Sequence, residues 1–357
     1  MLSIGIIGLP NVGKSTLFNA LTDAGALAAN YPFATIEPNT GIVPVPDPRL
    51  AILQKMYSAE KVIPATVTFV DIAGLVAGAS KGEGLGNQFL HNIRECDAIV
   101  HVVRAFSNDD ILRHGDAPID PQADIDIINT ELMLADLQTI EKHLPKLQKE
   151  MKSDPTKRVE FEQLEKFRDA LNSDSLRNSK FETRNSSLQL LSAKPTIYVF
   201  NVDENDLTDE KKRSQLSSLV APADTVFVCA KLEEELRSLD EVDAAELLNS
   251  YGVTESGLHQ LARAAYHTLG LQSYLTAGSK EVRAWTIPQG ATAPEAAGVI
   301  HTDFEKGFIA AQIISYPDLI ATGSELAAKQ AGKIATVGRD YTMQPDDIVE
   351  FRFNKTK

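Results

Sequence analysis

Short apolar runs alternate with helical patterns along the first two thirds of the chain. The runs are rich in valine, isoleucine and phenylalanine, which is typical of buried strands. Strands that alternate with helices predict a mainly parallel sheet, with ligands bound at the carboxyl ends of the strands. The predicted strands cover residues 4–7, 66–71, 98–103, 196–201 and 225–231.

A long helical pattern interrupts this alternation between residues 124 and 151. Its leucine and isoleucine side chains form an apolar stripe, and Pro145 within it indicates a kink. After a polar break at 153–155, a second stripe runs from Phe161 to Leu171. Two helices joined by a tight break predict an antiparallel coiled-coil hairpin that projects from the domain. The alternative is that both stripes pack flat on the core.

The pattern changes again from about residue 275. Three apolar runs indicate strands, and a turn-rich stretch at 290–294 leads into a short alanine-rich helix. This order fits a small α+β module. The predicted strands of this module cover residues 282–287, 308–314 and 348–353.

Candidate chemistry is concentrated between Gly8 and Thr16, directly after the first strand. The segment reads Gly-Leu-Pro-Asn-Val-Gly-Lys-Ser-Thr and has the G-x-x-x-x-G-K-S spacing of a phosphate-binding loop, between a strand and a helix start. Backbone N–H groups and the helix N-terminus would face phosphate oxygens, and Lys14 would reach the β and γ phosphates. The alternative is a glycine-containing turn that only links strand to helix. The predicted nucleotide contacts in this loop are Asn11, Val12, Gly13, Lys14, Ser15 and Thr16.

Three residues are predicted to hold Mg²⁺, namely Ser15, Thr35 and Asp71. The Ser15 hydroxyl can ligate the ion directly, and Asp71, at the end of strand 66–71, can hold it through water. The Thr35 hydroxyl would complete the sphere once a γ-phosphate orders its loop, although a threonine that caps a turn is the alternative. The backbone amide of Gly74 could approach the γ-phosphate.

Composition and charge indicate which kinds of partner the chain can bind. The chain has 357 residues, enough for two or three domains, and its net charge of −14 argues against general affinity for nucleic acid, including DNA. Residues 130–192 hold equal numbers of basic and acidic side chains, so a local face that touches RNA remains open. We expect no membrane span and no signal peptide. The two cysteines lie apart without metal spacing, which favours a cytoplasmic location.

The motifs occur in the order of the translation-factor-class GTPases, and the chain resembles the YchF family of Obg-related P-loop NTPases. Besides the phosphate loop, the resemblance rests on residues 31–41, 71–88, 284–288 and 301–308. It implies an α/β fold and the ribosome or its subunits as partner, and we expect a monomer. The implied domains are a P-loop G domain with a mainly parallel sheet (1–129 and 193–274), an inserted α-helical coiled-coil hairpin (130–192) and an α+β TGS domain with a ubiquitin-like β-grasp fold (275–357).

The base-reading segment departs from the guanine pattern. Such folds read guanine with Asn-Lys-x-Asp, whereas this chain has Asn201-Val202-Asp203-Glu204. The longer Glu204 would place its carboxylate differently, and adenine could donate to Asn201 Oδ1 or to a backbone carbonyl beside Val202. The resemblance likewise implies ATP rather than GTP. The alternative is relaxed specificity, with both ATP and GTP bound. Cys229-Ala230-Lys231 resembles a Ser-Ala-Lys base loop with Ala230 at the base, and it favours binding of both nucleotides.

Hydrolysis is expected to be slow, because Leu75 stands where related GTPases have a glutamine that orients water. Asn11 matches a position that ligates K⁺ in related proteins, with a turn residue as the alternative. The family's proposed catalytic histidine aligns with Arg113, one residue before His114, so His114 is either the catalytic histidine or a surface residue.

The favoured function is a slow, Mg²⁺-dependent ATPase that acts as a nucleotide-controlled switch. A GTPase or dual-nucleotide regulator in which hydrolysis is incidental is the alternative. A small-molecule phosphotransferase has weaker support, because no substrate pocket with a general base is apparent.

Overall fold

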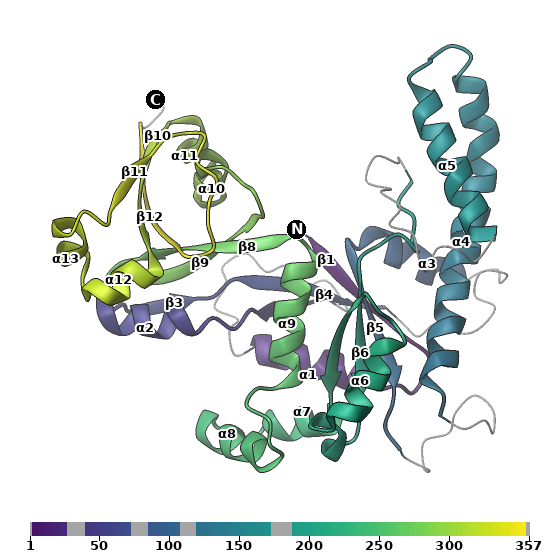
Figure 1. Ribbon diagram of the computed structural model, residues 1–357, viewed down its shortest axis with the longest axis horizontal. Helices are drawn as coiled ribbons and strands as arrows, with labels where there is room; N and C mark the ends of the chain where they lie inside the picture. The colour runs from purple at the N-terminus through teal and green to yellow at the C-terminus, as the bar shows by residue number, and fades with distance from the viewer. Residues whose placement is uncertain (1, 27–39, 73–84, 108–118, 173–187, 355–357) are drawn as a thin grey trace. The chain divides into compact units, whose positions relative to one another are not determined.

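The described residues form two six-stranded sheets. Figure 1 shows the computed structural model of the chain. The structure describes residues 2–26, 40–72, 85–107, 119–172 and 188–354. By its internal contacts the chain divides into two compact units, which are described separately below. The first unit comprises Met1–Gly41 and Thr68–Leu261, and the second comprises Ile42–Val67 and Ala262–Lys357.

The first sheet has the strand order β2-β4-β1-β5-β6-β7. The pairings among β4, β1, β5, β6 and β7 are all parallel, which confirms the prediction of a mainly parallel sheet. The strands of this sheet are β1 (Ser3–Ile7), β2 (Thr40–Pro44), β4 (Thr66–Asp71), β5 (Ala98–Arg104), β6 (Thr196–Asn201) and β7 (Asp224–Val228).

One predicted strand is too long. The strand expected over 225–231 ends at Val228, and the following residues begin helix α7 (Ala230–Leu236) with Cys229 at its N-cap position. The residues after Cys229 read Ala-Lys-Leu-Glu-Glu-Glu-Leu, all of which favour helix. The apolar run therefore crosses a boundary between two elements.

Further helices of the described chain include residues of the first unit. Among them is one short 3₁₀ helix, η2 (Glu204–Leu207), that follows β6. The α-helices are α1 (Lys14–Ala26), α3 (Leu85–Glu95), α4 (Pro121–Glu150), α5 (Lys157–Asn172), α6 (Glu210–Ser218), α8 (Glu241–Ser250) and α9 (Gly257–Thr268). No helix in the described part of the chain is long and apolar enough to cross a membrane.

Helix α4 packs on two different partners along its length, and it continues through Pro145. Its first half joins the sheet core, where Ile128 and Leu132 lie in one cluster with residues of β1, α3 and β5. Its second half packs against α5, through Leu144 and Leu147. Figure 1 shows α4 and α5 side by side. The first half of α4 therefore packs on the sheet core and the second half packs on α5, whereas a coiled-coil hairpin stays a prediction.

A buried carboxylate holds the chain where it returns from α5 toward β6. Asp136 on α4 is fully buried and accepts hydrogen bonds from Leu191 N (2.8 Å), Ser192 N (2.8 Å) and Ser192 Oγ (2.6 Å). These bonds compensate the carboxylate for its lost hydration. They hold residues 191–192 against α4, close to the start of β6.

The second sheet is mixed and has the order β11-β10-β12-β8-β9-β3. Its described core includes Tyr274, Ile287 and Ile313, packed against the alanine-rich α10. The predicted α+β module and its three strands are confirmed. β3 comes from a segment that the sequence-based boundaries assign to the first domain, and it pairs in parallel with β9. The elements that lie wholly in this unit are α2 (Pro48–Tyr57), β3 (Lys61–Ile63), β8 (Leu271–Ala277), β9 (Glu281–Pro288), α10 (Ala293–Ile300), α11 (Thr302–Lys306), β10 (Phe308–Ser315), α12 (Tyr316–Thr322), α13 (Glu325–Gln330), β11 (Ala335–Val337) and β12 (Asp347–Phe353).

Candidate functional site

The predicted phosphate loop lies between the carboxyl end of β1 and the start of α1. Both of its framing glycines have positive φ, 155° at Gly8 and 97° at Gly13. A Cβ atom at Gly8 would lie 2.5 Å from the carbonyl oxygen of Val102, and one at Gly13 would collide with Asn201 Nδ2. The path of the loop therefore requires glycine at both positions.

The side chain of Lys14 folds back onto the phosphate loop. This side chain is buried, and Nζ donates to the carbonyl oxygen of Leu9 at 2.7 Å. Burial lowers the pKa of Lys14 to about 8, although the negative charge of Asp71 opposes this shift. An anionic phosphate beside Nζ would favour the charged ammonium and raise the pKa again. Lys14 is therefore placed to respond to a phosphate.

Asn11 has a left-handed backbone with φ of 62°, and it is exposed. Asparagine tolerates this conformation better than most residues with a side chain. The backbone therefore supports the turn role of Asn11, and ligation of K⁺ stays a prediction.

Two of the three groups predicted to hold Mg²⁺ lie within the described residues, Ser15 near the start of α1 and Asp71 at the end of β4. Ser15 is exposed and Thr16 half-exposed in the first turn of α1. Asp71 lies opposite Ile6 in the pairing of β4 with β1, and burial raises the pKa of its carboxyl group while Lys14 opposes that shift. Mg²⁺ in nucleotide sites takes one or two protein oxygens besides phosphate and water. One hydroxyl and one carboxylate fit that set, and the described residues contain no cluster of three or more His, Cys, Asp or Glu for an all-protein site.

Asn201 connects the phosphate loop with the start of α7. Its Nδ2 donates to the carbonyl oxygen of Val12 at 3.0 Å, and its Oδ1 accepts from the N–H of Ala230 at 3.0 Å. All three residues are buried. Asn201 Oδ1, which was predicted to accept from adenine, therefore already accepts a hydrogen bond from a backbone N–H. The geometry gives the Asn201 amide a positioning role.

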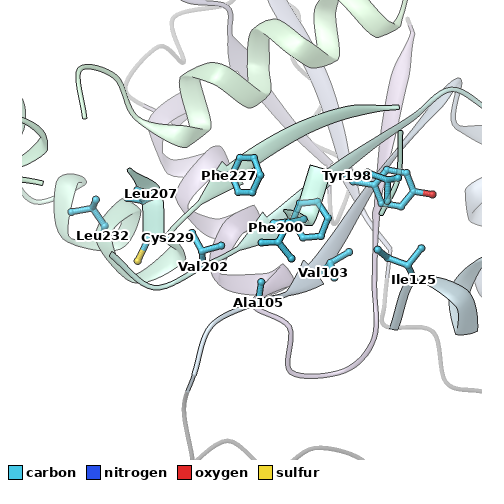
Figure 2. Close-up of a cluster of buried hydrophobic side chains, with 12 residues drawn as sticks. Val103, Ala105, Ile125, Tyr198, Phe200, Val202, Leu207, Phe227, Cys229 and Leu232 are labelled. Atoms are coloured by element: carbon cyan, nitrogen blue, oxygen red, sulfur yellow. The ribbon is translucent and has the colours of Figure 1, made fainter. Parts of the chain in front are cut away.

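The side chain of Val202 points into the core. It is 1% exposed and belongs to an apolar cluster with Phe200, Leu207 and Cys229 (Figure 2). Its N–H donates to the carbonyl oxygen of Val228 at 2.9 Å. A contact between Val202 and a base would therefore use its backbone. The sequence does not reveal this, because a residue just past a strand end can turn to either face.

Glu204 forms an ion pair that the sequence analysis missed. Glu204 Oε1 accepts from Lys231 Nζ at 2.9 Å. This hydrogen bond lowers the pKa of the Glu204 carboxyl group, which is ionised at neutral pH. The ion pair therefore connects the two segments that are predicted to contact the base.

Four residues of the predicted mechanism, Thr35, Gly74, Leu75 and His114, lie outside the described residues. The structure does describe the start of the segment that contains His114. The N–H of Ser107 donates to Asp203 Oδ2 at 2.9 Å, so Ser107 contacts the predicted base-reading segment.

His101 is a buried group beside the phosphate loop that the sequence analysis did not single out. It is 2% exposed on β5 and pairs in register with Ile7, the last residue of β1. Its ring centroid lies 5.2 Å from that of Tyr198. Burial lowers the pKa of His101 to about 3, and the positive charge of Lys14 adds to this shift. The signal in the sequence is one histidine within an apolar run.

The neutral state of His101 predicts a specific acid sensitivity. The unfolded chain protonates this histidine below about pH 6.5, whereas the folded protein resists protonation down to about pH 3. Stability is therefore lost as the pH falls through this window. Between pH 7.5 and pH 4.5, His101→Leu should gain about 3 kcal/mol in free energy of unfolding relative to the unsubstituted protein.

Urea unfolding of both proteins at pH 7.5, 5.5 and 4.5 would measure this gain. His143→Leu, a half-exposed histidine on α4, is the control and should show no comparable pH-dependent gain. A stability difference between His101→Leu and the unsubstituted protein that does not change with pH would contradict the buried neutral state.

Comparison with known proteins identifies the family. A family model described as "50S ribosome-binding GTPase" matches residues 3–154, and the model YchF-GTPase_C, described as a protein of unknown function, matches residues 271–354. A Haemophilus influenzae protein named "Ribosome-binding ATPase YchF" is 52% identical over 358 residues, which cover 98% of each chain. The chain belongs to the YchF family.

Other YchF proteins agree along their whole length. A Bacillus subtilis protein with the same name is 48% identical and covers 99% of each chain. The solved structure described as the Schizosaccharomyces pombe YchF GTPase is 40% identical, with a TM-score of 0.86, and the match covers 98% of this chain and 97% of that one. The matches confirm the predicted P-loop domain and show a YchF C-terminal domain over residues 271–354, whereas the TGS fold predicted for that part stays a prediction.

Proposed function

We propose that this protein is a slow, Mg²⁺-dependent ATPase that acts as a nucleotide-controlled switch on the ribosome. The observation that carries the proposal is the phosphate loop itself, with two required glycines, a buried Lys14 and an asparagine that joins the loop to the base side. Its bacterial relatives are named ribosome-binding ATPases. Their similarity over the full length supports the same activity and partner here.

Each residue has a defined task in this proposal. The loop N–H groups bind the phosphates, and Lys14 leaves the carbonyl of Leu9 to contact the β and γ phosphates. Ser15 and Asp71, with Thr35, would hold Mg²⁺, which when bound neutralises charge between the β and γ phosphates. The amide of Gly74 would bind the γ-phosphate.

Turnover is expected to be slow, because Leu75 cannot orient a water molecule by hydrogen bonding. In our proposal His114 acts on the attacking water. Asn11 would hold K⁺ near the bond between the β and γ phosphates, where negative charge develops during hydrolysis. Both roles stay predictions.

ATP is the favoured nucleotide, although the names of the relatives differ on this point: the bacterial proteins are called ATPases and the S. pombe structure a GTPase. Asn201 Oδ1 already binds the N–H of Ala230, so the backbone carbonyl beside Val202 is the better candidate to accept from the adenine amine. Glu204 is paired with Lys231, whose ammonium competes with guanine for the carboxylate.

We expect helices α3, α4 and α5 to transmit the state of the bound nucleotide to a partner. Helix α3 follows the segment of Gly74, and its Phe89, Leu90 and Ile93 share a buried cluster with α4. We propose that the γ-phosphate orders the segments of Thr35 and Gly74 and that α4, α5 and the proposed TGS domain (275–357) report this to the ribosome. We further propose that the protein acts as a cytoplasmic monomer.

Calorimetric titration with non-hydrolysable analogues of ATP and GTP would test the nucleotide preference. The ATP analogue should bind about ten times more tightly or better, because a site with polar base contacts discriminates strongly. A UTP analogue serves as the control for phosphate binding alone. Tighter binding of the GTP analogue would overturn the proposed preference.

A second candidate function is a binding regulator in which hydrolysis is incidental, and Leu75 is the observation that favours it. The two functions differ in their response to ribosomes. Turnover that does not rise with added ribosomes or K⁺, together with nucleotide-dependent ribosome binding, would select the regulator.

A further inference from the structure

The ion pair between Glu204 and Lys231 joins two segments that would both face the base. Glu204 begins η2 after β6, and Lys231 lies in the first turn of α7 after β7. These strands are neighbours in the sheet, so their carboxyl ends are adjacent. The side chain of Glu204 is 25% exposed and that of Lys231 74% exposed, with a separation of 2.9 Å between Oε1 and Nζ. The pair therefore lies at the surface of the site.

A carboxylate at the position of Glu204 is the group that would accept two N–H donors from guanine. The ammonium of Lys231 already donates to it, and the negative charge of Glu235 on the same helix also acts on Lys231. The neighbouring Cys229 is buried, and a thiol is a weak hydrogen-bond donor. Among the described contacts, Lys231 is therefore the main side-chain donor to the Glu204 carboxylate.

We propose that Lys231 is a specificity-determining residue, which disfavours guanine by engaging the Glu204 carboxylate. Guanine must compete with the ammonium for this carboxylate to gain its two hydrogen bonds. Adenine has no N1–H and no 2-amino group, so it loses nothing to the pair. This inference rests on the proposed ATP preference and names one residue that produces it.

Replacement of Lys231 by methionine tests the proposal, because methionine keeps an unbranched stem and removes the charge. The measured quantity is the ratio of the GDP and ADP dissociation constants, obtained by calorimetry on the full-length protein. We expect Lys231→Met to shift this ratio toward GDP about fivefold, which corresponds to about 1 kcal/mol, the upper range for an exposed ion pair. In a Glu204→Gln background the same substitution should leave the ratio unchanged, because its effect acts through Glu204.

Lys212→Met is the matched control. Lys212 pairs with Asp206 of η2 at 2.5 Å, so the substitution breaks an ion pair to the same short helix and spares the pair of Glu204. It should leave the ratio unaltered.

Two results would overturn the role of Lys231. One is an unchanged ratio in Lys231→Met, and the other is a shift of equal size in the Glu204→Gln background, which would mean that Lys231 acts on the base directly. Tighter binding of GDP than of ADP by the unsubstituted protein would instead overturn the proposed ATP preference. The failure of either proposal is therefore visible separately.

Discussion

Replacement of Lys14 by methionine is expected to reduce ATP turnover by about 10²–10³-fold, the usual cost of removing one group that stabilises charge in the transition state. Methionine can occupy the buried path of the lysine stem, but it offers no ammonium to the phosphates. ATP affinity should fall as well, because the loop then binds phosphate through backbone N–H groups alone. Steady-state phosphate release and calorimetry with an ATP analogue measure the two losses.

The control for Lys14→Met is Lys166→Met on α5, which removes an exposed ammonium far along the chain from the loop. It should retain full turnover and affinity. Thermal unfolding of both variants shows whether the fold is kept. Unaltered hydrolysis in a folded Lys14→Met protein would remove the phosphate loop from the mechanism.

Replacement of Asn201 by alanine should lower both stability and nucleotide affinity. The change strips a hydrogen-bond partner from the carbonyl of Val12 and from the N–H of Ala230, both of which are buried. Two buried groups left unsatisfied cost about 2–5 kcal/mol in free energy of unfolding. Urea unfolding measures this loss. Affinity falls because the phosphate loop and the base loop lose their shared support.

Two further variants separate the causes. Asn129→Ala removes an amide that donates to the Tyr198 hydroxyl at a long 3.5 Å, and it should cost much less stability. Asn201→Asp keeps an acceptor for Ala230 and sets a carboxylate against the carbonyl of Val12, so its nucleotide affinity should also fall. If Asn201→Ala keeps the stability and affinity of the unsubstituted protein, the asparagine has no positioning role.

Five of the six strands in the first sheet and three of the six in the second could be predicted from local patterns, because a buried strand needs several consecutive apolar residues. Strand β6, for example, has the predicted bounds of residues 196–201. The strand predicted over 225–231 was too long for a different reason. A local pattern cannot show where a strand ends when the next helix also begins with apolar residues, whereas the bond from Ala230 N to Asn201 Oδ1 marks that boundary in the folded chain.

The path of α4 shows a similar limit. Its apolar stripe predicts a buried face over its whole length, and the structure confirms this. The stripe itself does not say what covers each half. The sheet core buries the first half and α5 the second, because residues 191–192 are held on Asp136 and bring the chain back partway along the helix.

By itself, the sequence determined the phosphate loop, its lysine and the departure from the guanine-reading pattern, because these depend on residue identity and spacing along a continuous segment. The tertiary structure decided how the base side works. Asn201 binds Val12 and Ala230, Val202 turns into the core and Glu204 meets Lys231, all through the alignment of strand ends in a parallel sheet. Contacts between residues 27 to 189 positions apart depend on that alignment, which no local pattern encodes.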